Sequence, residues 1–210
     1  MAVRAGQDID LNGNLPVTYT KSDLPPEEIR LRKNIWGASL MLDLFLSLQL
    51  GRPPAAFDCL RSPPLSTQYE SSDCDLSKLP IQIFQHAVSL CTIISRINLH
   101  LYLGFSTLNM QTLSEKLATL KGELQTWQQL LPAEFRISIG HQQDRAILEL
   151  NMLYHIAVIL LYRPFCRDNT IPHAIETVAE AASAFNTLLD KYKLSQNEIP
   201  TSSPPLSQTN

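Results

Sequence analysis

Apolar residues recur every three or four positions along five stretches of the chain, the spacing that places them on one side of an α-helix. The five predicted helices cover about residues 26–50, 80–103, 113–131, 144–162 and 172–192. A glycine or proline closely follows each of the first four stretches, as is common where a helix ends. No sustained alternation of apolar and polar positions predicts a strand. The pattern therefore predicts an all-α fold, an irregular bundle of about five packed, mostly antiparallel helices.

The first predicted helix differs from the others because it is apolar around most of its circumference. One stripe repeats at every fourth position: Trp36, Leu40, Leu44 and Leu48. A second stripe lies beside it: Ile35, Leu42, Leu46 and Leu50. A helix of this kind needs neighbours on both sides, whereas the later helices carry mostly one-sided stripes that would cover only one side of it. We therefore expect members of the second stripe to be exposed together, and the chain to self-associate or to dock onto another protein.

Three segments lack a helical pattern. Residues 1–24 are polar and irregular, which predicts an N-terminal arm before a helical domain at residues 25–195. Within that domain, the prolines of residues 51–79 predict a long loop. Residues 196–210 are rich in proline, serine, threonine and glutamine, which predicts a disordered tail.

Composition limits the classes of function. The 210 residues are 44 % apolar, which is typical of a globular protein with its own core. The net charge of −3 gives no overall attraction to nucleic acid, so we expect no direct nucleic-acid contact by this chain. No window of eighteen uninterrupted apolar residues predicts a membrane span.

Residue patterns typical of catalysis or metal binding are missing from the sequence. The four cysteines show no Cys-x-x-Cys spacing, and the five histidines form no His-Glu-x-x-His pair. The seven glycines form no phosphate-binding loop. We therefore expect no catalytic, metal-binding or DNA-binding residue, no cofactor in this chain, and no enzyme activity.

Asp43 is the most suggestive single residue, because it lies within the apolar part of the first predicted helix. A buried carboxylate needs a charged or hydrogen-bonded partner. Arg52 and Arg163 are the natural candidates for an ion pair, since each lies at a predicted helix end beside a proline. The alternative is that Asp43 is exposed on a boundary face of the helix.

Three sequence patterns follow one another along the chain. The first pattern reads Arg-x-Arg-x-x-x-Trp, then Leu-Asp, then Gly-Arg-Pro. The second pattern is an acidic segment that ends in Leu-Pro at Pro80. The third pattern is Tyr-His followed by Arg-Pro-Phe. In this order they resemble the fungal-specific transcription factor domain, the middle homology region of fungal zinc-cluster transcription factors. The residues of the first and third patterns are Arg30, Arg32, Trp36, Asp43, Gly51, Arg52, Pro53, Tyr154, His155, Arg163, Pro164 and Phe165. The family often has arginine after the aspartate, where this chain has Leu44.

The resemblance, which spans about residues 27–192, implies a regulatory domain of a nuclear transcription factor that controls transcription by RNA polymerase II. In such proteins a separate N-terminal cluster of six cysteines binds zinc and reads DNA, and that module is not in this chain. The chain would hold the C-terminal part of the middle region, with protein partners, self-association or a small-molecule effector as its ligands. The alternative is a helical scaffold for protein–protein interaction without a DNA-binding role of its own.

Overall fold

The computed structural model describes residues 25–52, 54–55, 79–103, 109–137, 144–166 and 171–197. These residues form five long α-helices and no strand, which confirms the predicted all-α fold. The helices are α2 (Pro26–Leu50), α3 (Leu79–Ile97), α4 (Met110–Leu130), α5 (Arg145–Tyr162) and α6 (Ala174–Asn197). A π-helix, η4 (Asn98–Leu103), continues α3, and two short 3₁₀-helices, η6 (Ala133–Phe135) and η7 (Arg163–Cys166), follow α4 and α5. The expected N-terminal arm, most of the long loop and nearly all of the tail lie outside the described residues.

Local sequence explains where the helices begin and end. Two prolines and two glutamates suit the first turn of α2, where no backbone N–H is needed and negative charge is favoured. Gly51 ends α2 in the left-handed conformation, with φ of 62°, and donates its N–H to the Ser47 carbonyl. The side chain of Asn109 caps α4 by accepting from the Thr112 N–H at 2.8 Å, and that of Asp144 caps α5 by accepting from the Ala146 N–H at 3.0 Å.

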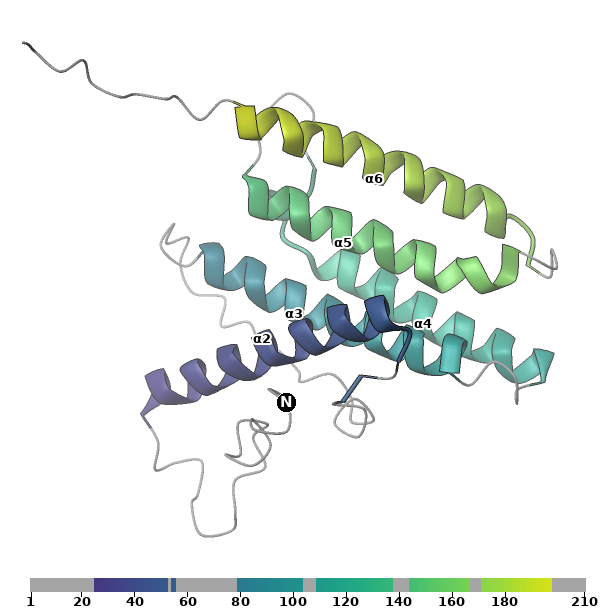
Figure 1. Ribbon diagram of the computed structural model, residues 1–210, viewed down its shortest axis with the longest axis horizontal. Helices are drawn as coiled ribbons and strands as arrows, with labels where there is room; N and C mark the ends of the chain where they lie inside the picture. Colours follow the sequence, from purple (N-terminus) through teal and green to yellow (C-terminus); the bar gives the residue numbers. More distant parts are fainter. Residues whose placement is uncertain are drawn as a thin grey trace, which may run out of the picture.

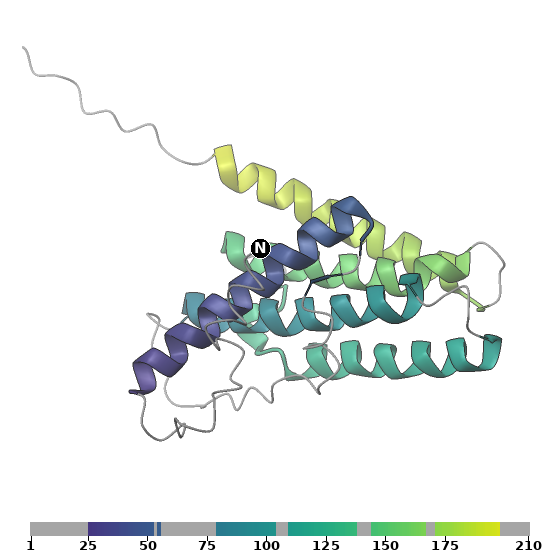
Figure 2. The same ribbon diagram turned by 60° about the horizontal axis from the view of Figure 1, so that its bottom comes forward.

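The helices are packed as an ordered series with α3 and α5 in the middle (Figures 1 and 2). α3 contacts α2, α4 and α5, and α5 contacts α6. α2 therefore lies on one side of the bundle and α6 on the other, and each packs mainly against a single helix. This arrangement leaves α2 with a large surface that no described helix covers.

The core is formed by the apolar stripes of α3, α4 and α5, with one leucine from α2. Its fully buried members include Leu44, Leu90, Ile94, Ile97, Leu120, Phe135, Leu150 and Leu161. Trp127 joins three helices: its indole N–H donates to the His86 carbonyl at 3.2 Å, and its ring stacks on Tyr154 at 5.7 Å. A smaller cluster of Leu148, Met152 and Leu188 packs α6 against α5.

One stretch, Arg145–Cys166, is long and apolar enough to cross a membrane by length and composition, with a mean hydropathy of 1.4. This stretch is α5 with η7, which packs against α3 on one side and α6 on the other. A helix surrounded by other helices needs the same apolar composition. We therefore interpret α5 as a core helix of the bundle.

Candidate functional site: an exposed apolar face of α2

Only the side of α2 that faces α3 is buried. Trp36, Gly37, Leu44 and Ser47 make up this buried side. The two helices approach closely at Gly37, where an added Cβ atom would lie 2.8 Å from the Val88 Cγ2 atom of α3. Glycine is therefore required at this point for the observed approach of α2 to α3.

The opposite side of α2 carries most of the exposed large apolar residues of the described chain. Ten such residues are exposed, and six of them lie on α2, with exposed fractions of 41–63 %. We call these six the α2 outer face: Leu31, Ile35, Leu42, Phe45, Leu46 and Leu50. The predicted exposure of Ile35, Leu42, Leu46 and Leu50 is therefore confirmed. Soluble monomers seldom expose so many large apolar side chains in one continuous area, and such areas usually mark contact with another protein.

The centre of the α2 outer face follows the spacing of a coiled-coil seam. Residues 31, 35, 38, 42, 45 and 49 are separated alternately by four and three positions, and only the last of them, Gln49, is polar. This spacing places one residue toward a neighbouring helix at each successive turn. The face therefore has the residue spacing found where one helix packs along another.

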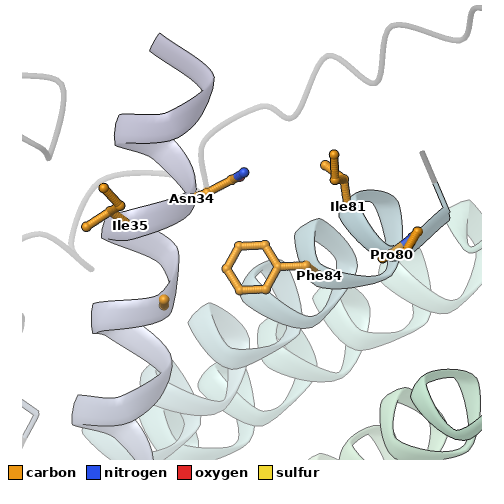
Figure 3. Close-up of a pocket in the computed structure, with 6 residues that line it drawn as sticks. Asn34, Ile35, Pro80, Ile81 and Phe84 are labelled. Atoms are coloured by element: carbon orange, nitrogen blue, oxygen red, sulfur yellow. The ribbon is translucent and has the colours of Figure 1, made fainter. Parts of the chain in front are cut away.

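A groove extends the α2 outer face toward α3 at the amino-terminal half of both helices. It has a volume of about 390 Å³ and is lined by Asn34, Ile35 and Ala38 from α2 and by Pro80, Ile81 and Phe84 from α3. Figure 3 shows the Phe84 ring directed from α3 toward α2, with Ile81 and Pro80 beside it. The groove is open and mainly apolar, so it suits a side chain of a docked helix. No separate pattern in the sequence predicts this groove, because it depends on how α2 crosses α3.

Charge is concentrated in the first turns of α2. Arg30 and Lys33 are exposed, and Arg32 forms an ion pair with Glu28 at 2.8 Å. This pair is partly exposed and contributes little to stability. From Asn34 to Leu50 the helix has one charged residue, Asp43. The outer face therefore offers an almost uncharged surface over its last four turns.

The expected ion pair of Asp43 with Arg52 or Arg163 is not formed. Both arginines are exposed, and among the described residues neither lies within ion-pair distance of Asp43. Asp43 is half-buried, and its Oδ2 atom accepts a hydrogen bond from the Ala55 backbone N–H at 2.6 Å. The left-handed turn at Gly51 lets the following residues fold back along α2, so a backbone amide takes the place of the expected cation.

A family profile described as "Fungal specific transcription factor domain" matches residues 1–129. This chain belongs to that family. The match includes α2, α3 and almost all of α4, whereas the Tyr154–Phe165 pattern lies beyond the matched residues. No solved structure matches the chain.

Two curated relatives of this fungal transcription factor domain are regulatory proteins by name. The chain is 25 % identical over 205 residues to the acetamidase regulatory protein of Aspergillus fumigatus, covering 92 % of this chain and 25 % of the relative. It is 26 % identical over 193 residues to an uncharacterized transcriptional regulatory protein of Schizosaccharomyces pombe, covering 79 % of this chain and 30 % of the relative. The chain therefore spans less than a third of the length of either protein.

The family-pattern residues of this transcription factor domain have structural roles on separate helices. On α2, Trp36 is buried and Gly51 ends the helix, while Pro53 lies outside the described residues. On α5, the Tyr154 hydroxyl donates to Gln128 Oε1 at 3.0 Å, and the His155 ring lies edge-on to the Tyr154 ring. Burial lowers the pKa of His155, which favours its neutral form.

The Arg-Pro-Phe part of the third pattern forms η7, directly after α5. Phe165 is buried in the main core, Pro164 is half-buried and Arg163 is exposed. No hydrogen bond or ion pair among the described residues joins this group to α2. The described residues also contain no group of three or more histidine, cysteine, aspartate or glutamate side chains that could hold a metal ion. The candidate site is therefore the exposed α2 outer face with the groove beside it.

Proposed function

We propose that this chain is the regulatory domain of a longer fungal zinc-cluster transcription factor, and that it acts through helix-to-helix contact at the α2 outer face. Membership of the family and the names of the two relatives support the transcriptional role. In this proposal the whole protein works in the nucleus, on transcription by RNA polymerase II, and a separate zinc cluster reads the DNA. The domain itself is not an enzyme and binds neither zinc nor promoter DNA.

The occupant that we propose for the α2 outer face is a second copy of the chain. The seam from Leu31 to Gln49 is about 27 Å long and presents on the order of 500 Å² of apolar surface. With the neighbouring groove, this area approaches the roughly 800 Å² that each partner contributes to a standard interface. A two-fold pair is self-complementary, because the same apolar face serves both partners.

The distribution of charge favours an antiparallel pair. A parallel pair would bring the exposed Arg30 and Lys33 of both copies together. In an antiparallel pair the charged first turns of each copy lie beside the uncharged last turns of the other, so the repulsion is avoided. Asp43 already accepts a hydrogen bond from its own chain at Ala55 and is not a seam residue.

A reporter assay tests the regulatory role. The chain is inserted between a heterologous DNA-binding module and an activation segment, and transcription of the matching reporter is measured in yeast. We expect the wild-type domain to change reporter output at equal protein level, and the Leu42→Glu variant to lose most of that change. Leu194→Glu is the matched control, since Leu194 is equally exposed but lies on α6. A reporter that does not respond to the inserted domain would contradict the regulatory proposal.

The alternative function, a scaffold without a DNA-binding role, uses the same exposed face. The coding sequence that belongs upstream of residue 1 distinguishes the two. A cluster of six cysteines with lysine and arginine between them is expected for the transcription factor. A gene without such a cluster would favour the scaffold.

A further inference from the structure

A second cavity lies on the other side of α3 from the groove, between the carboxyl end of α3 and α4. Its volume is about 280 Å³. Arg96 and His100 line it from the α3–η4 side. Thr112, Lys116 and Thr119 line it from one face of α4, and the buried Leu120 contributes an apolar wall.

The basic groups of this cavity are held in place by the fold. The Arg96 Nη1 atom lies 2.9 Å from Glu123 Oε1, and both side chains are about four-fifths buried. This ion pair ties the end of α3 to α4 and fixes the guanidinium at the cavity wall. Lys116 is half-buried, and it forms no ion pair with any described residue. Its ammonium group is therefore the least compensated charge of the cavity.

Two positive charges act on His100 at the cavity wall. Burial is the main reason that the pKa of His100 is lowered, and the positive charges of Lys116 and Arg96 lower it further. Glu115 also lines the cavity, but it is exposed at the rim, where it accepts from the Gln111 amide at 3.4 Å. The Arg96 charge is balanced by Glu123, with which it pairs, so Lys116 is the cation of the cavity lining that has no ion pair among the described residues.

The backbone at the cavity wall is also unusual. His100 lies in the π-helix Asn98–Leu103, which continues α3 with a wider turn. π-Helical turns are rare, and they occur frequently at functional sites. This observation is independent of the charges and concerns the same wall of the cavity.

We propose that this cavity binds a small organic monocarboxylate. Lys116 and Arg96 face the carboxylate, and Leu120 contacts the apolar part of the ligand. The Lys116 ammonium, which has no ion pair among the described residues, matches one negative charge, which favours a carboxylate over a doubly charged phosphate. The volume of about 280 Å³ lies just below the range for ligand pockets, about 300–1,000 Å³, so the ligand is small. The role of this ligand as an effector rests on the proposed regulatory function, whereas the binding of a carboxylate in the cavity does not depend on that function.

Binding is tested on the purified chain with sodium butyrate and sodium benzoate, against sodium chloride and sodium phosphate at equal ionic strength. NMR titration follows the His100 ring, and we expect saturable shifts with either carboxylate and a rise in the pKa of His100 when the carboxylate lies beside it. We expect Lys116→Gln to weaken binding at least tenfold, because it removes the unpaired positive charge and leaves a neutral polar side chain. Lys121→Gln is the matched control, since Lys121 is exposed on α4 and does not line the cavity.

Three results would overturn the carboxylate site. They are shifts that chloride reproduces, binding of phosphate without either carboxylate, and unchanged affinity in Lys116→Gln. These measurements use the isolated domain and no reporter, so a failed titration leaves the transcriptional proposal intact. Conversely, saturable binding with a silent reporter would contradict the regulatory role and retain the site.

Discussion

Replacing Leu42 by glutamate tests whether α2 is an interface between two copies of the chain. Leu42 is 60 % exposed and lies on the seam of the α2 outer face. Burying a whole leucine side chain contributes about 1.5–3 kcal/mol, so burial of its exposed part contributes about 1–2 kcal/mol for each copy. The substitution acts twice in a two-fold dimer, and each glutamate also carries a cost for leaving water. We expect dimerisation to weaken by at least about 3 kcal/mol, roughly a hundredfold in dissociation constant.

Sedimentation velocity between about 1 and 100 µM measures this change, since it covers dissociation constants typical of moderate interfaces. We expect concentration-dependent association of the wild-type chain and a monomer for Leu42→Glu. Leu194→Glu adds the same charge at an equally exposed leucine of α6, and it should associate like the wild type. Thermal unfolding of dilute samples should change little, because substitutions of exposed residues usually stay within about 0.5 kcal/mol. A wild-type chain that sediments as one monomeric species, with a cooperative thermal transition, would refute the reasoning.

Three further predictions concern stability and are measured by denaturant unfolding. Asp43→Ala should lower the free energy of unfolding by about 1–2 kcal/mol, as expected for loss of a hydrogen bond to a backbone amide. A decrease of more than about 3 kcal/mol would instead indicate a buried ion pair. Gly37→Ala should destabilise the fold by about 1–3 kcal/mol, because the added methyl group clashes with α3. Gly122 lies on α4 with open space around it, so Gly122→Ala should stabilise the fold by about 0.5–1 kcal/mol. Equal effects of the two substitutions would contradict the close approach of α2 to α3. Burial lowers the pKa of His86 to about 4, so between pH 6.5 and 4 the unfolded chain binds more protons than the folded chain. Stability should therefore fall as the pH decreases from about 6.5 to 4. His86→Leu should reduce this dependence of stability on pH, and an unchanged dependence would exclude His86 as its source.

The helices were predictable where the signals are local. The prolines at the start of α2 and the glycine at its end gave its bounds, Pro26–Leu50, without any tertiary information. The change from α-helix to π-helix at Asn98 was not predictable, because the apolar spacing continues through it. The spacing of apolar residues indicates which side of a helix is buried. It changes too little over a single wider turn to distinguish a π-helix from an α-helix.

The exposed face of α2 was predictable for a different reason. A helix that is apolar on all sides requires more covering surface than four one-sided helices provide, and this comparison uses sequence alone. The partner of Asp43 was not predictable, since the choice between an arginine and the Ala55 amide depends on the path of the chain after Gly51. The carboxylate cavity was also missed, because its residues are spread over 25 positions of two helices and form no compact motif.

The two proposed sites share one element, and this leads to a last prediction. Pro80, Ile81 and Phe84 at the start of α3 line the groove beside the α2 outer face, and Arg96 and His100 near its end line the carboxylate cavity. We expect a ligand that shifts α3 relative to α4 to change the groove beside the α2 outer face, where a second copy would bind. Coupling between two binding sites is reciprocal, so butyrate should change the dimer dissociation constant by the same factor by which dimerisation changes butyrate affinity. Sedimentation at several butyrate concentrations gives the first factor, and NMR titration of dilute and concentrated samples gives the second. Lys116→Gln should abolish the butyrate effect on sedimentation while leaving the dimer itself intact. A dimer dissociation constant that butyrate leaves unchanged, or a butyrate effect that persists in Lys116→Gln, would show that α3 does not connect the sites.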